Sequence, residues 1–306
     1  MKNILIIGGD GYIGSYLSMS FDKKYKVSII DINWFNDNES VDFKNLESNY
    51  LNDFDSIILL AGHSSVKMCD TDMVSSFKNN VDNFIGLISK INKSQKLIYA
   101  SSSSVYGHTG DQIVDENYKL FEPNNYYDLT KQVIDMYSSI TDINYYGLRF
   151  GTVNGWSPNL RTDIMINSMV NSGITDGHIK LYIKDIMRPI LGIKDLCKAI
   201  EVIIECDEDK RGIYNLASFN NTSEEISNGV SKVMNIPVVE YNVNDIEKIT
   251  NTKLQTSAYN FSIDSSKFEK AFNFTFCENI ETITRSIIEG FDTCKKANRS
   301  NIKKYE

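Results

Sequence analysis

Two short stretches of the sequence hold side chains able to move a proton. Residues 99–107 read YASSSSVYG, with four consecutive serines between an apolar run and a tyrosine–glycine pair. Residues 124–137 read NNYYDLTKQVIDMY, where only the second tyrosine, Tyr127, has a lysine, Lys131, four residues on. On a helix these two side chains share a face, and the ammonium would favour the phenolate form, which can act as a base. The same spacing also arises by chance as an exposed helix pair, and the serine stretch alone does not show which hydroxyl reacts.

A glycine-rich turn follows the first apolar segment. In NILIIGGDGYIG, residues 3–14, Gly8, Gly11 and Gly14 are spaced G-x-x-G-x-x-G between an expected strand and an expected helix. Such glycines permit a tight turn and let a pyrophosphate approach backbone N–H groups. Asp31 ends the second apolar segment, and a carboxylate there accepts hydrogen bonds from a ribose and repels a 2′-phosphate. The pattern therefore predicts NAD rather than NADP; the alternative is an ordinary strand–turn–helix with a surface aspartate.

The elements that must position these groups alternate in type along the first half of the chain. Short apolar segments rich in β-forming residues are separated by longer segments with helical spacing. Continuous apolar strands between helices indicate a parallel sheet covered on both faces, so we predict a doubly wound α/β (Rossmann) fold. The expected strands are 3–8, 26–31, 56–62, 96–101 and 144–150, and the expected helices are 12–22, 73–92 and 126–141.

The pattern changes after residue 150. Residues 151–163 have the composition of a loop, with glycines and a Ser-Pro turn signal. Beyond them we expect one strand at 213–218 and helices at 163–172, at 223–235, in SKFEKAFNF and in ENIETITRSIIEGF. The prediction is a dinucleotide-binding domain made of 1–155 plus about 185–217, and a smaller interleaved C-terminal substrate lobe made of about 156–184 plus 218–306.

Composition narrows the class of protein. Of the 306 residues, 42% are hydrophobic, which is ordinary for a globular protein. The net charge is −8, and this negative charge argues against a nucleic-acid partner. Five widely spaced cysteines and three histidines show no metal-ligand spacing, so we predict a reduced, cytoplasmic protein without a metal. No window approaches the roughly 20 apolar residues of a membrane span, and the apolar run at the N-terminus is too short for a signal peptide.

Taken together, the motifs resemble those of the extended short-chain dehydrogenase/reductase family. The glycine turn, the Ser-Val-Tyr-Gly stretch and Tyr127-x-x-x-Lys131 are similar to its NAD-dependent epimerase/dehydratase branch, which acts mostly on nucleotide sugars. Further stretches with family counterparts are LAGHSSV (60–66), NNVDNFIGL (79–87), LRFGTVNG (148–155) and RPILGIKDLCKAI (188–200). The resemblance implies an enzyme with NAD as cofactor and a nucleotide sugar as substrate.

The resemblance also implies residue roles. The family's catalytic serine or threonine lies four residues before the tyrosine of Val-Tyr-Gly, here Tyr106, so Ser102 joins Tyr127 and Lys131 as an expected catalytic residue. Alternation along a strand would point Ser104 the same way, leaving Ser101 and Ser103 with structural roles. The expected cofactor-binding residues are Gly8, Gly11, Tyr12, Ile13, Gly14, Asp31, Ile32, Leu60, Ala61, Gly62, Asn80, Ala100, Tyr127 and Lys131. The expected substrate-binding residues are Ser102, Ser104, Tyr127, Thr152, Arg161, Asn167 and Arg188.

Departures from the family pattern favour one reaction. Dehydratases of the branch resemble one another in Thr-Asp-Glu at 102–104, and sugar-acid decarboxylases carry a glutamate at the place of Ser104; here both acids are serines. Reversible hydride transfer at a ring hydroxyl, most simply 4-epimerisation, remains. The alternatives are a net reductase or dehydrogenase of a nucleotide sugar, and a non-catalytic NAD-binding member of the fold.

Several expectations concern charged residues and assembly. Arg188 is expected to meet substrate phosphate, whereas Arg161 and Lys253 are as well explained as surface charges. His63 lies in an expected cofactor-side loop, where a polar contact and a bland role are both open. Arg149 is expected to form a structural ion pair.

The family usually dimerises through the helices at 73–92 and 126–141, so we predict a homodimer.

Overall fold

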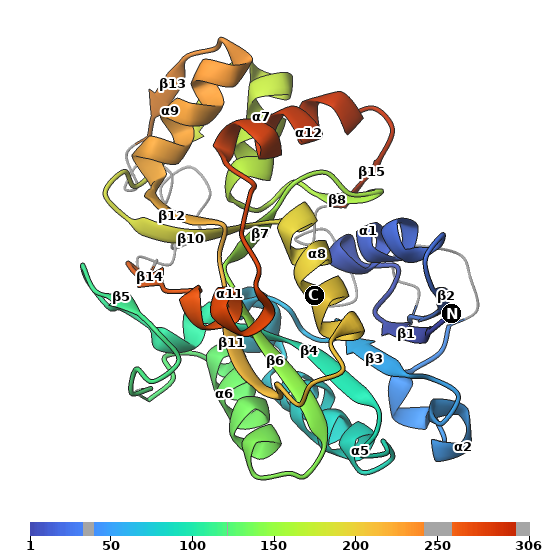
Figure 1. Ribbon diagram of the computed structural model, residues 1–306. Coiled ribbons are helices and arrows are strands. Elements are labelled where there is room, and N and C mark those ends of the chain that lie inside the picture. Colours follow the sequence, from blue (N-terminus) through green and yellow to red (C-terminus); the bar gives the residue numbers. More distant parts are fainter. Residues whose placement is uncertain (33–39, 121, 242–258, 298–306) are drawn as a thin grey trace.

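A six-stranded parallel sheet forms the centre of the larger part of the molecule (Figure 1). The computed structural model describes residues 1–32, 40–120, 122–241 and 259–297. The strand order β11-β6-β4-β3-β1-β2, with every pair parallel, is the doubly wound arrangement expected from the sequence. The strands are β1 (Asn3–Ile7), β2 (Lys26–Ile30), β3 (Ser56–Leu59), β4 (Lys96–Ser102), β6 (Asn144–Phe150) and β11 (Gly212–Leu216).

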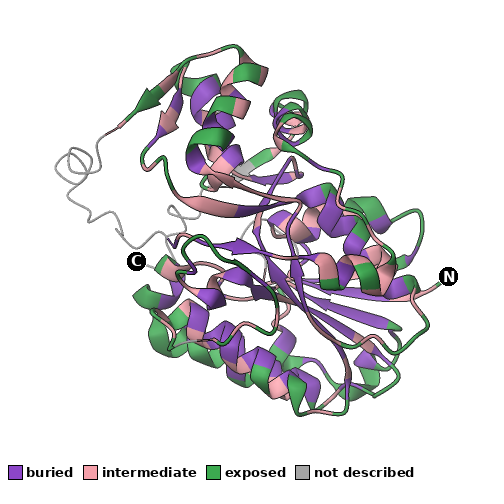
Figure 2. Cartoon of the chain, turned by 60° about the vertical axis from the view of Figure 1, so that its left-hand side comes forward, coloured by how far each residue is buried: buried purple, intermediate pink, exposed green. Residues whose placement is uncertain are grey.

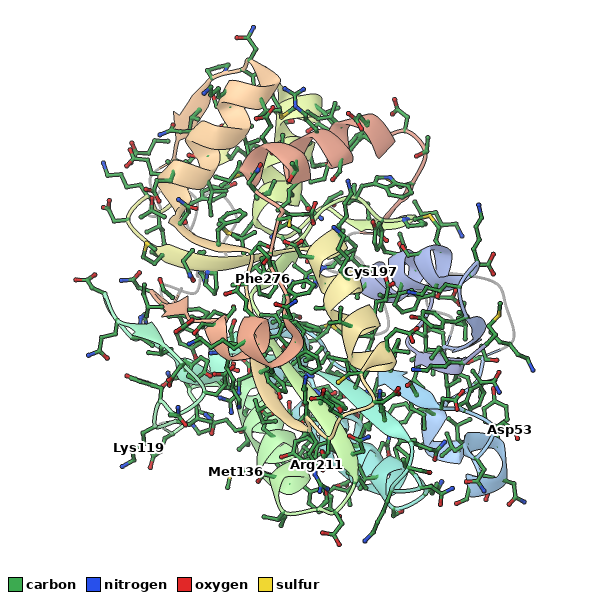
Figure 3. All side chains as sticks on the ribbon, viewed as in Figure 1. Asp53, Lys119, Met136, Cys197, Arg211 and Phe276 are labelled. Atoms are coloured by element: carbon green, nitrogen blue, oxygen red, sulfur yellow. The ribbon has the colours of Figure 1, made fainter. Side chains whose placement is uncertain are left out.

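Helices cover both faces of this sheet, which is why its strands are apolar without alternation. In β1, Ile4 and Ile6 belong to one hydrophobic core, and Leu5 and Ile7 belong to another on the opposite face. Figure 2 shows the central strands as mostly buried and the outer faces of the helices as exposed. One face is covered by α1 (Tyr12–Phe21) and α8 (Ile193–Glu205), with Cys197 lying between them (Figure 3), and the other by α5 (Asn83–Ile88) and α6 (Tyr126–Ser139).

The helix expected at 73–92 is shorter in the structure, where it ends at Ile88, and it is not α-helical throughout. The chain forms α4 (Met73–Phe77), a π-helical turn η2 (Lys78–Asp82) and then α5, which ends at Ile88. The smaller helices α2 (Ser48–Leu51) and α3 (Val66–Thr71) and the 3-10 turn η1 (Phe43–Asn45) fill the connections. A π turn accommodates an extra residue within a helix and commonly lies near a functional site. Here it brings Asn80 against the loop that follows β3.

A smaller lobe lies above the carboxyl ends of the strands, at the top of Figure 1. Its helices α7 (Met165–Asp176), α9 (Ser223–Met234) and α12 (Ile280–Gly290) contact one another. Part of the chain expected in this lobe instead returns to the sheet, because α11 (Ser266–Phe272) packs on β11. The short strands are β5 (Ile113–Val114), β7 (Thr152–Asn154), β8 (Asn159–Arg161), β9 (Ile179–Leu181), β10 (Met187–Gly192), β12 (Phe219–Thr222), β13 (Val238–Glu240), β14 (Ser262–Ile263) and β15 (Lys295–Ala297).

The serine stretch spans the end of a strand and the start of a turn. Ser101 and Ser102 end β4, whereas Ser103 and Ser104 begin a 3-10 turn, η3 (Ser103–Tyr106), so alternation along a strand does not orient Ser104. The Ser101 hydroxyl donates to Asp135 and the Ser103 hydroxyl to the carbonyl of Phe150. These two serines therefore have the structural roles expected for them.

A buried ion pair ties α6 to the sheet. Arg149 in β6 donates from Nε to Asp135 of α6 at 2.9 Å and from Nη1 to the Tyr106 hydroxyl at 2.8 Å. Asp135 also accepts from Tyr99 and Ser101 in β4. The expected structural role of Arg149 is thus confirmed.

None of the helices in the described ranges is long and apolar enough to cross a membrane.

We expect Arg149→Met to lower the free energy of unfolding by about 3 kcal/mol or more, because it leaves the Asp135 carboxylate buried without its counter-charge. Urea denaturation followed by circular dichroism measures this change. The control is Arg285→Met, which breaks an exposed pair with Glu281 and should cost less than about 1 kcal/mol. Similar losses in the two variants would contradict a special role for the buried pair.

Candidate active site

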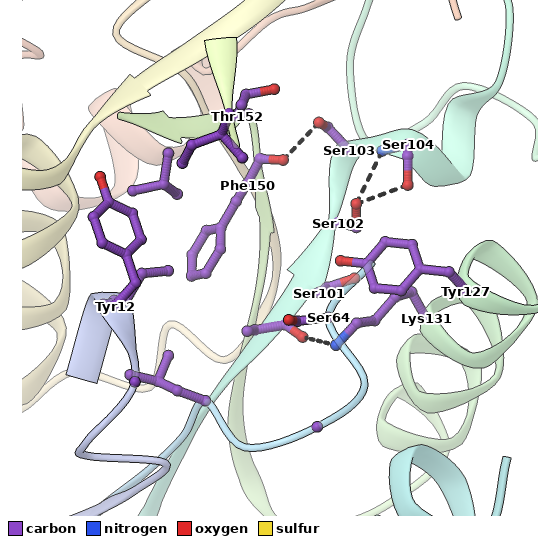
Figure 4. A pocket seen from close by; sticks show the side chains of 18 of the residues that line it. Tyr12, Ser64, Ser101, Ser102, Ser103, Ser104, Tyr127, Lys131, Phe150 and Thr152 are labelled. Atoms are coloured by element: carbon purple, nitrogen blue, oxygen red, sulfur yellow. Dashed lines mark hydrogen bonds between the residues drawn. The ribbon is translucent and has the colours of Figure 1, made fainter. Parts of the chain in front are cut away.

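A cavity of about 290 Å³ opens where β1, β3, β4 and β6 end (Figure 4). In a parallel doubly wound sheet, this edge is where ligands bind. The cavity is lined by Gly8, Gly11, Tyr12, Ile13, Gly14, Leu60, Ala61, Gly62, His63, Ser64, Ala100, Ser101, Ser102, Ser103, Ser104, Tyr127, Lys131, Phe150, Gly151, Thr152, Val153, Arg161, Ile164, Arg188 and Phe261. The structure thus brings the three expected catalytic residues together with most of the expected binding residues.

The three expected catalytic side chains enter the cavity from two elements. Figure 4 shows Tyr127 and Lys131 projecting from α6, with Ser102 at the end of β4 beside them. The Lys131 ammonium donates to the carbonyl of Ala100 at 2.6 Å and lies 5.7 Å from the centre of the Tyr127 ring. The Ser102 and Ser104 hydroxyls are 2.8 Å apart. Tyr126, the neighbouring tyrosine, is exposed and lies outside the cavity lining.

Burial dominates the electrostatics of this group. It raises the pKa of Tyr127 to about 12, although a hydrogen bond with Ser102 acts in the opposite direction. Burial also lowers the pKa of Lys131 to about 8. The Lys131 ammonium contacts a carbonyl and the ring, and it is not among the groups that shift the pKa of Tyr127 here, so the expectation that it favours the phenolate stays a prediction. The phenol form of Tyr127 predominates at neutral pH.

The glycine turn forms the floor of the cavity through backbone alone. Gly8 has a φ of +88°, and a Cβ built on it would lie 2.5 Å from the nitrogen of Ala61. A Cβ on Gly14 would lie 2.2 Å from the carbonyl oxygen of Gly8. Side chains at these positions would collide with neighbouring backbone, so the turn holds its shape only with glycine. This leaves backbone N–H groups at the start of α1 open to a phosphate.

A second cavity, of about 110 Å³, adjoins the first at the end of β2. Asp31 and Ile32 line it, and the Asp31 carboxylate accepts from the backbone N–H of Asp10 at 3.0 Å. Ser64 lines both cavities, and its buried hydroxyl has no hydrogen-bond partner among the residues that the structure describes. Such a hydroxyl, in adjoining cavities that the glycine turn and Asp31 also line, fits an extended dinucleotide spanning the two cavities.

Two expected binding residues lie outside both cavity linings. The Asn80 amide accepts from the His63 backbone N–H at 2.8 Å and donates to its carbonyl and to Thr130. Asn167 accepts from the Gly155 N–H and donates to Arg161 and Tyr12. Both amides are buried and positioned by protein groups, so in this structure they hold the loops that form the cavity rather than face it.

The charged residues of the cavity differ in their partners. Arg161 forms two hydrogen bonds to Asp163, at 2.9 and 2.8 Å, whereas no carboxylate in the described ranges pairs with Arg188. Burial lowers the pKa of Arg188, which reflects a cation held away from water. An arginine in such surroundings favours an anionic ligand. Lys253 lies outside the described residues, and no group of metal ligands occurs within them.

Sequence reasoning missed Asp128. Its side chain is 2% exposed and accepts a hydrogen bond from Ser104, so a carboxyl group lies beside the serine stretch even though positions 103 and 104 are not acids. The signal was present in the sequence, because Asp128 directly follows Tyr127. A step of one residue turns a helix by about 100°, however, and this gave no reason to place both side chains near Ser104.

We expect Asp31→Asn to weaken NAD binding and to strengthen NADP binding, narrowing the preference for NAD by at least about tenfold. The amide retains hydrogen-bonding capacity but no longer repels a 2′-phosphate. Fluorescence titration with each dinucleotide measures the two Kd values. Asp42→Asn, at another carboxylate of the same cavity, is the control, and an equal effect from it would contradict a specific role for Asp31.

Comparison with known proteins agrees with this geometry. Residues 4–217 match the model of the NAD dependent epimerase/dehydratase family. Protein CapI of Staphylococcus aureus is 25% identical over 233 residues, which cover 66% of this chain and 69% of CapI. UDP-glucuronate 4-epimerase 6 of Arabidopsis thaliana is 25% identical over 184 residues, which cover 50% of this chain and 40% of that protein.

Among solved structures, the UDP-glucuronic acid 4-epimerase of Bacillus cereus, in complex with UDP-glucuronic acid and NAD, superposes with a TM-score of 0.79. It is 20% identical, and the match covers 95% of this chain and 99% of that one, so the two share a fold. The family match spans more than half of the chain and includes the glycine turn, Ser102, Tyr127 and Lys131. The chain belongs to the NAD dependent epimerase/dehydratase family, and NAD is its cofactor.

Proposed function

We propose that the protein is an epimerase that acts on a nucleotide sugar by reversible hydride transfer at a ring hydroxyl, most simply at C4. The observation that carries this proposal is the placement of Ser102, Tyr127 and Lys131 in one cavity with the glycine turn. The relatives named as 4-epimerases support the same reaction. NAD, when bound, supplies the acceptor and donor of hydride.

The residues of the chain handle the proton and the orientation of the substrate. The hydroxyls of Ser102 and Tyr127 both face the cavity and can hydrogen-bond one substrate oxygen. Tyr127 then exchanges the hydroxyl proton as that oxygen changes between hydroxyl and keto forms. Lys131, fixed by the Ala100 carbonyl, supplies positive charge beside them below about pH 8.

The arginines of the cavity support a nucleotide diphosphate as the substrate's anionic part. Arg188 lines the cavity with no carboxylate partner among the described residues, and Arg161 lines it while paired with Asp163. Guanidinium groups bind phosphate oxygens in a bidentate manner. Thr152 and Ser104 line the same cavity and offer hydroxyls to the sugar. The Bacillus cereus relative is named with a substrate of this class, UDP-glucuronic acid.

We expect Tyr127→Phe to lower kcat at least about 100-fold while NAD remains bound, because the phenol that exchanges the proton is lost. Wild type and variant are incubated with a panel of UDP-sugars, and products are separated by ion-exchange chromatography. Native mass spectrometry reports retained NAD. The control is Tyr126→Phe, at an exposed position outside the cavity, which should stay within about twofold of wild type.

The fate of the coenzyme distinguishes the proposed epimerase from a reductase or dehydrogenase of a nucleotide sugar. An epimerase converts its sugar with no net consumption of NAD, whereas a reductase or dehydrogenase of a nucleotide sugar converts coenzyme in step with substrate. Full activity in Tyr127→Phe would contradict the assigned role of the phenol. Retained NAD with no turnover of any sugar would favour a non-catalytic member of the fold.

We also propose that the protein is a homodimer. Exposed apolar side chains lie on two helices that contact each other: Met73, Val74 and Phe77 on α4, and Tyr126 and Met136 on α6. Figure 3 shows Met136 pointing away from the molecule. Burying these side chains against a second copy would remove them from water.

We expect Val74→Glu to convert the dimer to a monomer, because a buried charge at the interface has no partner. Light scattering coupled to size-exclusion chromatography measures the molar mass. Val74 is 79% exposed in the single chain, and Ile113, 66% exposed in β5, provides the matched control. A monomeric wild type, or loss of the dimer with Ile113→Glu alone, would contradict the proposal.

A further inference from the structure

A chain of hydrogen bonds runs from the catalytic serine to a buried carboxyl group. Ser102 lies 2.8 Å from the Ser104 hydroxyl, and the Ser104 hydroxyl donates to Oδ1 of Asp128. Oδ2 of Asp128 accepts from Tyr259 at 2.7 Å and from the Asn125 amide at 2.6 Å. Among these three donors from the described residues, Ser104 is the one that also lines the active-site cavity.

Ser104 stands between two cavities. It lines the active-site cavity and also a separate outer cavity, of about 200 Å³. Asp128 lines this outer cavity together with Tyr259 and the exposed residues His108 and Glu122. Water in the outer cavity can therefore exchange protons with Asp128 without passing through the site where substrate binds.

The protonation state of Asp128 sets the direction of the hydrogen bonds. When the carboxyl group is ionised, Ser104 must donate to it, so Ser102 donates to Ser104 and accepts from the Ser104 backbone N–H and from Tyr127, which leaves the Tyr127 oxygen to accept from the cavity. When it is protonated, it can donate to Ser104, the order reverses, Ser102 donates to Tyr127, and Tyr127 donates into the cavity. An acceptor suits a substrate hydroxyl, and a donor suits a keto oxygen.

We propose that Asp128 is a positioning residue that stores the proton released by the substrate's hydroxyl. Tyr127 takes the substrate's proton while its own proton passes through Ser102 and Ser104 to Asp128, and the return step follows the same path. The inference rests on the proposed function. In the forward step the substrate O–H bond breaks, its electron pair stays on the substrate oxygen, and one O–H bond forms on Asp128. Tyr127, Ser102 and Ser104 each end with the one hydroxyl proton they began with.

The surroundings of Asp128 favour this role. Burial raises the pKa of its carboxyl group, the hydrogen bonds from Ser104, Tyr259 and Asn125 lower it, and Asp70 raises it. The carboxyl group therefore takes up a proton more readily than an ordinary aspartate. The titratable groups that face it are Tyr127 on its own helix, Cys69 and Asp70 on α3, Tyr259 before β14, and His108 and Glu122 across the outer cavity.

The pH profile of kcat/KM for the epimerised sugar tests the proposal. In wild type we expect it to fall on the acid side with a pKa above the roughly 3.9 of an ordinary aspartate. Asp128→Asn and Ser104→Ala should each lower kcat about 100-fold, change KM less than about threefold and abolish that acid limb. The double variant should be no worse than either single one, because the two residues act as a unit.

Tyr259→Phe is the matched control, since it removes a hydrogen bond to Asp128 but leaves the path through Ser104 intact. We expect it to keep kcat within about threefold and to move the acid limb to higher pH, because the charged carboxylate loses a donor. If it lowers kcat as much as Ser104→Ala does, Asp128 only braces the structure and the proposal fails. An unchanged profile in Asp128→Asn overturns it equally.

A titration without substrate separates this proposal from the proposed function. In protein labelled with 13C at the aspartate carboxyl, the Asp128 signal, assigned by its loss in Asp128→Asn, should titrate above the ordinary value and shift in Ser102→Ala. A signal that titrates at or below about 3.9, or ignores Ser102→Ala, overturns the relay even if no sugar is turned over. If both shifts appear but the wild-type protein turns over no sugar, the proposed reaction is overturned and the relay is not.

Discussion

The buried ion pair between Arg149 and Asp135 holds α6, the helix of Tyr127 and Lys131, in register with the sheet. Asp135 lies four residues after Lys131 and eight after Tyr127, so the three side chains share the face of α6 that looks onto β4 and β6. The same carboxylate accepts from Ser101, the residue before Ser102. One buried contact thus sets the distance between the serine on the strand and the tyrosine on the helix, which the proposed chemistry requires.

The parts of the site that could be predicted from the sequence are those whose signal is local. A glycine turn between a strand and a helix needs no distant residue to be recognised, and the register of the serines follows from Tyr106 in the same stretch. The strands were equally clear, because burial on both faces leaves an uninterrupted apolar run. Tyr127 and Lys131 could be paired because their spacing matches one helical turn.

The remainder depends on contacts that the chain makes at long range. Asp128 meets Ser104 across 24 residues and Tyr259 across 131, and neither contact leaves a periodic pattern. The amides of Asn80 and Asn167 match motif positions, yet packing directs them to backbone groups of neighbouring loops. The pKa of Tyr127 likewise follows from burial and from where the Lys131 ammonium points, which spacing alone does not encode.

The π-helical turn at Lys78–Asp82 changes the phase of the helix that contains it. Phe77 and Phe84 are seven residues apart and would face the same way on an unbroken α-helix. Phe77 is 37% exposed and Phe84 only 1%, because the wider turn delays the rotation between them. A single apolar stripe in the sequence is thereby divided into two, one facing outward from α4 and one inward from α5. One extra backbone residue lets a continuous segment serve an outer surface and an inner core at once.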